Sequence, residues 1–105
     1  MTFTVIVERE AKADLLKLYE YLLERAVYVE DLDTADLALQ AIEDAMAALA
    51  KTPFLFRKEA GSRSTLRREL VIPFGSSGYV LKYEIASPHL VVVLAVRHQH
   101  EADYH

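Results

Sequence analysis

Cysteine is absent from this chain of 105 residues, and glycine and proline occur only three times each. Without cysteine there is no disulfide framework, no thiolate nucleophile and no cysteine-based zinc site, which fits a reducing cytoplasm. No apolar run approaches the roughly 20 residues that a membrane-spanning helix needs, and the first residues lead into an amphipathic strand pattern instead of a secretion signal. We therefore expect a soluble protein that stays in the cytoplasm.

Apolar residues are plentiful enough to build one core. Hydrophobic residues make up 52% of the chain and charged residues 27%, which is far from the composition of disordered proteins. A chain of this length buries one core with little material left for a second. We expect residues 1–105 to form a single domain.

Charge is distributed unevenly along the chain. Residues 1–51 hold 5 Lys and Arg against 11 Asp and Glu, whereas residues 52–105 hold 7 against 5. The basic segment, defined as residues 57–68, contains five basic residues and one acidic residue. Such a run is usually a solvated loop, but over a Debye length of about 8 Å it also attracts an acidic partner.

The spacing of apolar residues predicts the secondary structure. Residues 3–7 are β-rich and alternate, and helical spacing follows from residue 9 to about 27 and again from a cap at Asp31 or Asp33 to the stop at Pro53. Three β-rich runs follow at residues 66–73, 79–86 and 90–97, and the last is apolar up to Val96, which favours a central strand buried on both faces. The expected fold is α+β in the order β-α-α-β-β-β, with a helical hairpin packed on a mainly antiparallel four-stranded sheet.

Three segments, in this order and spacing, resemble the ParE/RelE superfamily of toxins from bacterial toxin–antitoxin systems. They are the strand at residues 66–70, the Gly-Ser-Ser-Gly-Tyr turn at 75–79, and the closing segment at 93–104. The resemblance covers nearly the whole chain. It implies a toxin that is neutralised by a small antitoxin encoded beside it.

The superfamily divides by chemistry. RelE-type members resemble ribosome-dependent mRNA endonucleases, which use basic residues on the sheet and a tyrosine near the C-terminus. Here three of the basic positions fall on Val71, Pro73 and Val80, while a fourth falls at or next to His98 and the tyrosine corresponds to Tyr104. A sequence pI near 5.5 also suits RNA binding poorly. The pattern favours the ParE-type branch, which resembles protein-binding poisons of DNA gyrase and needs no catalytic residues.

Target binding is predicted at the end of the chain, where a rigid strand would present arginine and tyrosine, two residues enriched at binding hot spots. ParE-like sequences often carry arginine where this chain has His100. The predicted target-binding residues are Arg97, His98, His100 and Tyr104.

Antitoxin binding is predicted on two surfaces. The apolar residues that lie off the buried stripe of the first helix suggest a partly exposed partner site, and the basic segment would attract an acidic antitoxin tail. Arg67 and Arg68 are consecutive in a strand and point to opposite faces, so one of them could instead pair with Glu84. The predicted antitoxin-binding residues are Leu16, Tyr21, Arg57, Arg63, Arg67 and Arg68.

A metal or catalytic site is the weaker interpretation of the C-terminal histidines. His98, His100, Asp103 and His105 are of the types that bind Zn²⁺ or Ni²⁺. His98 and His100 could share a face of an extended segment, but no third ligand is fixed elsewhere. We assign no metal, no cofactor and no catalytic residue, and expect neither a membrane nor a nucleic acid as a direct partner. Two alternatives stay open: an endoribonuclease using His98, His100 and Tyr104, and a binding module that has lost toxicity.

Overall fold

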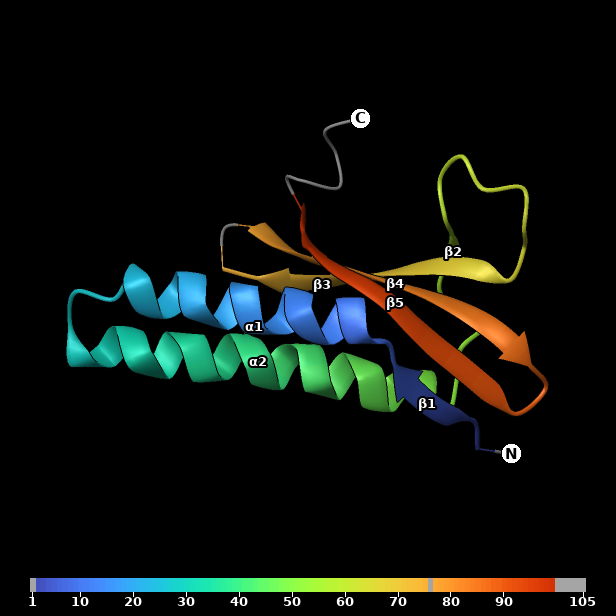
Figure 1. The fold of residues 1–105 in the computed structure, drawn as a ribbon, viewed down its shortest axis with the longest axis horizontal. Helices are drawn as coiled ribbons and strands as arrows, with labels where there is room; N and C mark the ends of the chain where they lie inside the picture. The colour runs from blue at the N-terminus through green and yellow to red at the C-terminus, as the bar shows by residue number, and fades with distance from the viewer. Residues whose placement is uncertain (1, 76, 100–105) are drawn as a thin grey trace.

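The computed structural model describes residues 2–75 and 77–99, and shows two helices packed on a five-stranded sheet (Figure 1). The α+β class is confirmed, but the predicted number of strands was one too few. The elements are β1 (Thr4–Val7), α1 (Arg9–Glu24), α2 (Val29–Leu49), β2 (Arg57–Lys58), β3 (Arg67–Phe74), β4 (Ser77–Ser87) and β5 (Leu90–His98).

The strands lie in the order β1-β5-β4-β3-β2. β1 runs parallel to β5 and every other pairing is antiparallel, as the sequence predicted for most of the sheet. β5 is an interior strand, but only alternate residues such as Val91 and Val93 are fully buried. β4 is the central strand, and its residues 78–81 are buried at every position.

The strand that the sequence did not predict, β2, contains only Arg57 and Lys58. It pairs Arg57 with Glu69 and Lys58 with Arg68 at the outer edge of β3. Two charged residues show no alternation of polar and apolar side chains, so their pairing depends on β3 being in place.

The helical hairpin differs from the prediction at its connection. α1 ends at Glu24, a few residues before the expected end near 27. α2 begins at Val29, so Asp31 lies in its first turn and is not the cap. Its carboxylate accepts hydrogen bonds from the backbone N–H groups of Val27 and Tyr28 at 2.8 and 3.0 Å. The bonds from Tyr28 and then Val27 lower the pKa of Asp31 below its usual value.

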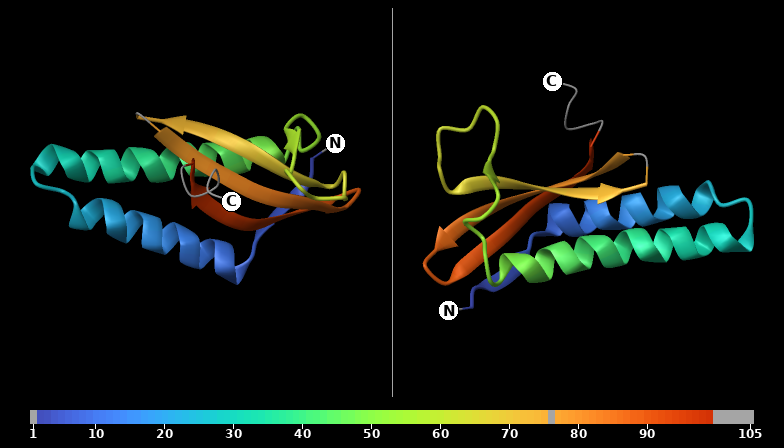
Figure 2. Two further views of the ribbon diagram at one scale, coloured as in Figure 1. Left: turned by 90° about the horizontal axis from the view of Figure 1, so that it is seen from above. Right: turned by 180° about the vertical axis from the view of Figure 1, so that it is seen from behind.

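Both helices cover one face of the sheet, and they lie below it in the right-hand view of Figure 2. The core between the layers joins Ala38, Ile42 and Leu49 of α2 to Leu81 and Tyr83 of β4. The hydroxyl of Tyr83 donates a hydrogen bond of 2.5 Å to the backbone carbonyl of Pro53, which follows α2. Neither helix in the described part of the chain is long and apolar enough to cross a membrane.

Candidate functional site

A groove of about 670 Å³ lies between α1 and the end of the sheet where β5 finishes and the β3–β4 turn begins. Its lining is mixed: aromatic rings come from both the helix and the sheet, and cationic groups lie at the same place. The side chains that bear on function are Lys17, Tyr21, Phe74, Tyr79, Arg97 and His98.

Asp14 positions the helix against the sheet at this groove. β1 pairs with β5 only as far as Val93, so β5 has a free edge beyond that residue. The Asp14 carboxylate accepts a bond from the Val96 backbone N–H at 3.0 Å and another from the Arg97 guanidinium at 2.9 Å. One carboxylate therefore satisfies the strand edge and orients the arginine, whose side chain stays 47% exposed.

Aromatic rings form the sheet side of the groove. His98 and Tyr79 are cross-strand partners, and their rings pack edge to face with centroids 5.9 Å apart. Phe74 lies against Tyr79 at 6.0 Å, and Nε2 of His98 is 3.0 Å from the hydroxyl of Ser77. Burial raises the pKa of Tyr79 above its usual value, so this ring is a neutral apolar surface at physiological pH.

The groove brings together residues that the sequence assigned to two different partners. Arg97 and His98, predicted for the target, line the same groove as Tyr21, predicted for the antitoxin. Leu16 is exposed on α1 but lies outside this lining. The remaining predicted target residues, His100 and Tyr104, lie outside the described residues, as do Asp103 and His105.

The groove residues that sequence reasoning missed include Asp14, Lys17, Phe74 and Tyr79. Alternation along β4 could have placed Tyr79 on the helix-facing side. The pairing of Tyr79 with His98 needs the strand register, and Asp14 gave no sign that it would bond to a strand edge 82 residues away. In the described part of the chain, no three His, Asp or Glu side chains gather as metal ligands.

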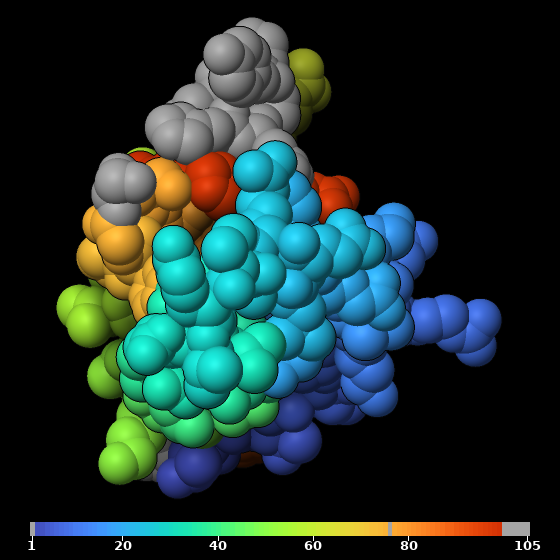
Figure 3. Space-filling model, turned by 90° about the vertical axis from the view of Figure 1, so that its left-hand side faces the viewer, coloured from blue at the N-terminus to red at the C-terminus, as the bar shows by residue number. Residues whose placement is uncertain are grey.

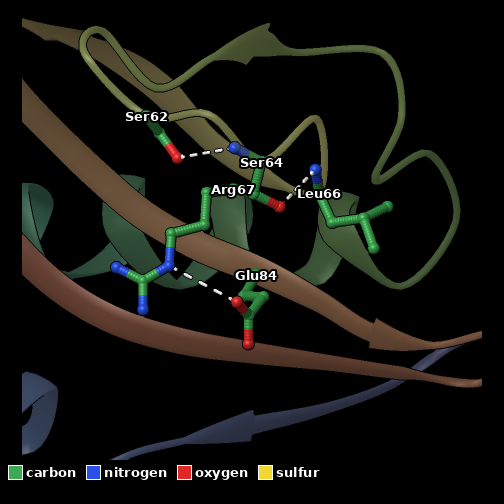
Figure 4. A network of polar contacts seen from close by, with 5 residues as sticks. All are labelled: Ser62, Ser64, Leu66, Arg67 and Glu84. Atoms are coloured by element: carbon green, nitrogen blue, oxygen red, sulfur yellow. Dashed lines mark hydrogen bonds and ion pairs between the residues drawn. The ribbon is translucent and has the colours of Figure 1, made fainter.

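Two arginines of the basic segment form ion pairs within the protein. The Arg57 guanidinium lies 2.8 Å from the carboxylate of Glu69, whose side chain is nearly buried. Arg67 pairs with Glu84 at 3.4 Å on adjacent strands (Figure 4), which confirms the local ion pair weighed as an alternative to antitoxin binding. Both members of the second pair are well exposed, so it contributes about 0–1 kcal/mol.

Arg68 has a structural position that argues against an antitoxin contact. Its guanidinium donates bonds to the carbonyls of Phe54, Phe56 and Thr65 at 2.9, 2.9 and 3.0 Å, and lies over the Phe54 ring. It therefore ties the segment after α2 to β3. The other consecutive arginine, Arg67, projects from the opposite face, as the strand geometry requires.

Among the predicted antitoxin-binding arginines, Arg63 alone has no hydrogen-bond or ion-pair partner within the described residues. It lies in the loop between β2 and β3, which is shaped by two serine side chains (Figure 4). The Ser62 hydroxyl accepts the N–H of Ser64 at 3.2 Å, and the Ser64 hydroxyl accepts the N–H of Leu66 at 3.1 Å. The loop thus presents an unpaired cation on an ordered backbone.

The sheet face turned away from the helices carries Val71, Pro73 and Val80, the positions that the sequence resemblance matched to basic residues of RelE-type toxins. Val71 pairs with Val80, Pro73 with Gly78, and Val80 with Arg97, so these positions project together from one face. The patch is apolar apart from Arg97, whose guanidinium is bonded to Asp14. His98 projects from the other face beside Tyr79.

Residues 5–103 match a protein family described as the ParE toxin of the type II toxin–antitoxin system parDE. The fold and this match define a toxin of the ParE/RelE class, and the chain belongs to the ParE toxin family.

Two relatives with curated names are both named RelE toxins, although the matching family model is a ParE family. The chain is 37% identical over 91 residues to a Caulobacter vibrioides protein named Toxin RelE3, covering 87% of this chain and 88% of the relative. It is 36% identical over 85 residues to Toxin RelE1 of the same organism, covering 81% and 82%. A solved structure titled chromosomal ParDE TA system from P. aeruginosa has the same fold, with a TM-score of 0.66 at 14% identity, covering 92% of this chain and 96% of that one.

Proposed function

We propose that this protein is a cytoplasmic toxin that inhibits DNA gyrase by binding it, without catalysis, and that a ParD-like antitoxin neutralises it. The observation that carries the proposal is that two valines, the partly buried Val71 and the fully buried Val80, are paired on the sheet face turned away from the helices. Phosphodiester cleavage depends on positioned charge that stabilises the reacting phosphate, and this is usually the largest catalytic contribution. Here valines occupy those positions, and Asp14 already binds the neighbouring Arg97.

The groove supplies what a protein-binding toxin needs. Hot spots combine large aromatic surfaces with arginine held in a defined orientation. Tyr79 and His98 provide the packed rings, and Arg97 is oriented by Asp14 while its side chain stays half exposed. These features support the target-binding role of Arg97 and His98.

Neutralisation follows from the shared position of Tyr21. An antitoxin segment that covers the exposed ring of Tyr21 would lie over the groove lined by Arg97 and His98. The antitoxin would then block the target sterically, with no change of toxin conformation required. The unpaired cation Arg63 would guide an acidic antitoxin segment to the surface.

A second candidate function is RelE-like mRNA cleavage, which the names of the two Caulobacter relatives favour. The contact between His98 and Ser77 at 3.0 Å is the described feature closest to an acid–base pair. It lies on the opposite face of the sheet from Val71 and Val80, so it would require a site organised differently from the RelE pattern.

The experiment that separates the two functions uses purified wild-type protein, Arg97→Ala, Tyr104→Ala, and Arg9→Ala as an exposed arginine control. We expect the wild type and Arg9→Ala to inhibit supercoiling of plasmid DNA by gyrase, and Arg97→Ala and Tyr104→Ala to inhibit about tenfold less. None should cut mRNA on translating ribosomes. Ribosome-dependent cutting by the wild type that disappears in Tyr104→Ala would establish the endonuclease instead.

A further inference from the structure

The connection between the two helices forms an exposed apolar surface at the end of the molecule opposite the basic segment (Figure 1). Val27 and Val29 are 78% and 77% exposed, and Tyr28 and Leu32 lie beside them with large exposed areas. Figure 3 looks onto this end of the molecule, where the connection and the start of α2 are nearest the viewer. We call these four residues the hairpin tip.

The hairpin tip is held in shape by hydrogen bonds. Asp31 accepts the backbone N–H groups of Val27 and Tyr28, which fixes the extended backbone that leads into α2. At the end of α1, the Arg25 backbone N–H donates to the Tyr21 carbonyl at 3.2 Å, and the Arg25 guanidinium lies 4.5 Å from the centre of the Tyr21 ring. A preorganised apolar surface loses little conformational entropy when a partner binds.

Acidic side chains surround the hairpin tip. Exposed carboxylates on α1 and α2 outnumber the single cation of this region, Arg25. They belong to Glu20, Glu24, Glu30, Asp33 and Asp36.

The acidic surroundings of the hairpin tip favour some binding partners over others. A second copy meeting tip to tip would bring like charges together, and four side chains bury far less than the about 800 Å² per partner of a stable interface. An acidic antitoxin segment would be repelled in the same way. A basic surface with an apolar centre is complementary, and proteins that bind DNA carry basic surfaces of this kind.

We infer that the hairpin tip is a second docking surface for the toxin's target, and that it binds a basic, DNA-binding protein surface. The inference rests on the proposed function, because it takes the target to be a protein that handles DNA. The tip adds contacts beyond the groove, just past the C-terminal end of the helix that carries Tyr21. The proposed antitoxin contacts include the groove but not the tip, so the two partners should differ in their dependence on the tip.

The test compares four proteins: wild type, Val27→Ser with Val29→Ser, Glu24→Lys with Asp33→Lys, and the control Leu55→Ser. Leu55 is 73% exposed and lies after α2, away from the tip. The measurements are affinity for purified gyrase at two salt concentrations, affinity for the antitoxin, oligomeric state, and growth arrest. We expect the valine variant to bind gyrase about tenfold more weakly while its antitoxin affinity stays within about twofold. The charge variant should bind gyrase more weakly and with less dependence on salt, and Leu55→Ser should match the wild type.

Three results would overturn the inference: unchanged gyrase affinity in the valine variant, an equal loss of antitoxin affinity, or a wild-type dimer that the variant converts to a monomer. Failure of the proposed function is distinguishable, because the wild type would then not bind gyrase at all. In that case growth arrest decides. A valine variant that binds antitoxin normally but no longer arrests growth supports a role of the hairpin tip in target binding. A valine variant that arrests growth like the wild type refutes that role.

Discussion

Asp14 on α1 holds the backbone of Val96 and the side chain of Arg97 with the two oxygens of one carboxylate, at 3.0 and 2.9 Å. The bond to Val96 closes the strand edge that β1 leaves free, and the bond to Arg97 fixes the cation proposed to contact the target. A helix residue far away in the sequence thereby links the stability of the sheet edge to the shape of the groove.

Substituting Asp14→Ala should therefore destabilise the protein by about 1–3 kcal/mol, because the Val96 N–H loses its partner in a half-buried position. Urea denaturation measures this change. Lys12→Ala, an exposed change on the same helix, should alter stability by less than about 0.5 kcal/mol. Equal stability of Asp14→Ala and wild type would mean that water replaces the carboxylate without cost.

Arg68→Ala should also destabilise the fold by about 1–3 kcal/mol, since its guanidinium bonds to three backbone carbonyls. Arg68→Lys should restore little of the loss, because an ammonium lacks the planar fork that reaches several acceptors at once. Arg63→Ala is the matched control from the same segment and should unfold at the wild-type urea concentration. Full rescue by lysine would show that charge alone matters at this position.

The antitoxin should associate more slowly with Arg63→Glu, and the double change with Arg67→Glu should lower both the rate and its salt dependence further. Arg63 is unpaired in the described part of the chain. The ion pair of Arg67 with Glu84 is exposed and therefore weak, so Arg67 remains available to attract an acidic partner. Stopped-flow or surface-binding kinetics give the rates. Arg9→Glu changes the net charge equally elsewhere, so the same slowing in that variant would assign the effect to overall charge.

Stability should fall in alkaline solution through Tyr83. Burial raises the pKa of Tyr83 from 10.0 to about 12, opposed by the nearby charge of Arg68. The folded state therefore favours the protonated phenol, and its contribution is fully present below pH 10 and is lost as the pH rises toward 12. Tyr83→Phe should lower the free energy of unfolding by about 1 kcal/mol near pH 7, because the hydrogen bond to the buried carbonyl of Pro53 is lost. The variant should also lose less stability than the wild type as the pH rises. An unchanged decline in Tyr83→Phe would assign it to other groups.

The order of elements was predictable because long apolar patterns specify helices and strands locally. The last strand was recognised from its run of valines, and the hairpin turns from glycine and proline. The exceptions depended on neighbours in space. β2 is stabilised by the ion pair between Arg57 and Glu69 on the neighbouring strand. α2 begins before its expected cap, and the Asp31 carboxylate accepts a hydrogen bond from the Val27 backbone N–H that precedes the helix.

The candidate site was predictable only in part for the same reason. Arg97 and His98 were found from the end of a buried strand, but consecutive residues project from opposite faces, so they play different parts in the groove. The assignment of Arg68 to the antitoxin surface did not foresee the carbonyl groups that surround it, since those carbonyls belong to a segment positioned by the end of α2.

The parallel pairing of β1 with β5 has a consequence for synthesis. Thr4 is paired with Leu90, so β1 cannot join the sheet until β5, which is synthesised much later, is available to pair with it. Contacts between chain ends form late because the intervening chain must first be brought into a loop. Arg97 and His98 pair with β4 and lie beyond the residues of β5 that pair with β1, so the groove forms only after β5 has been added to the sheet. Chains released before β5 is made would lack the proposed target-binding surface, so the topology would delay any toxic activity until synthesis is nearly finished.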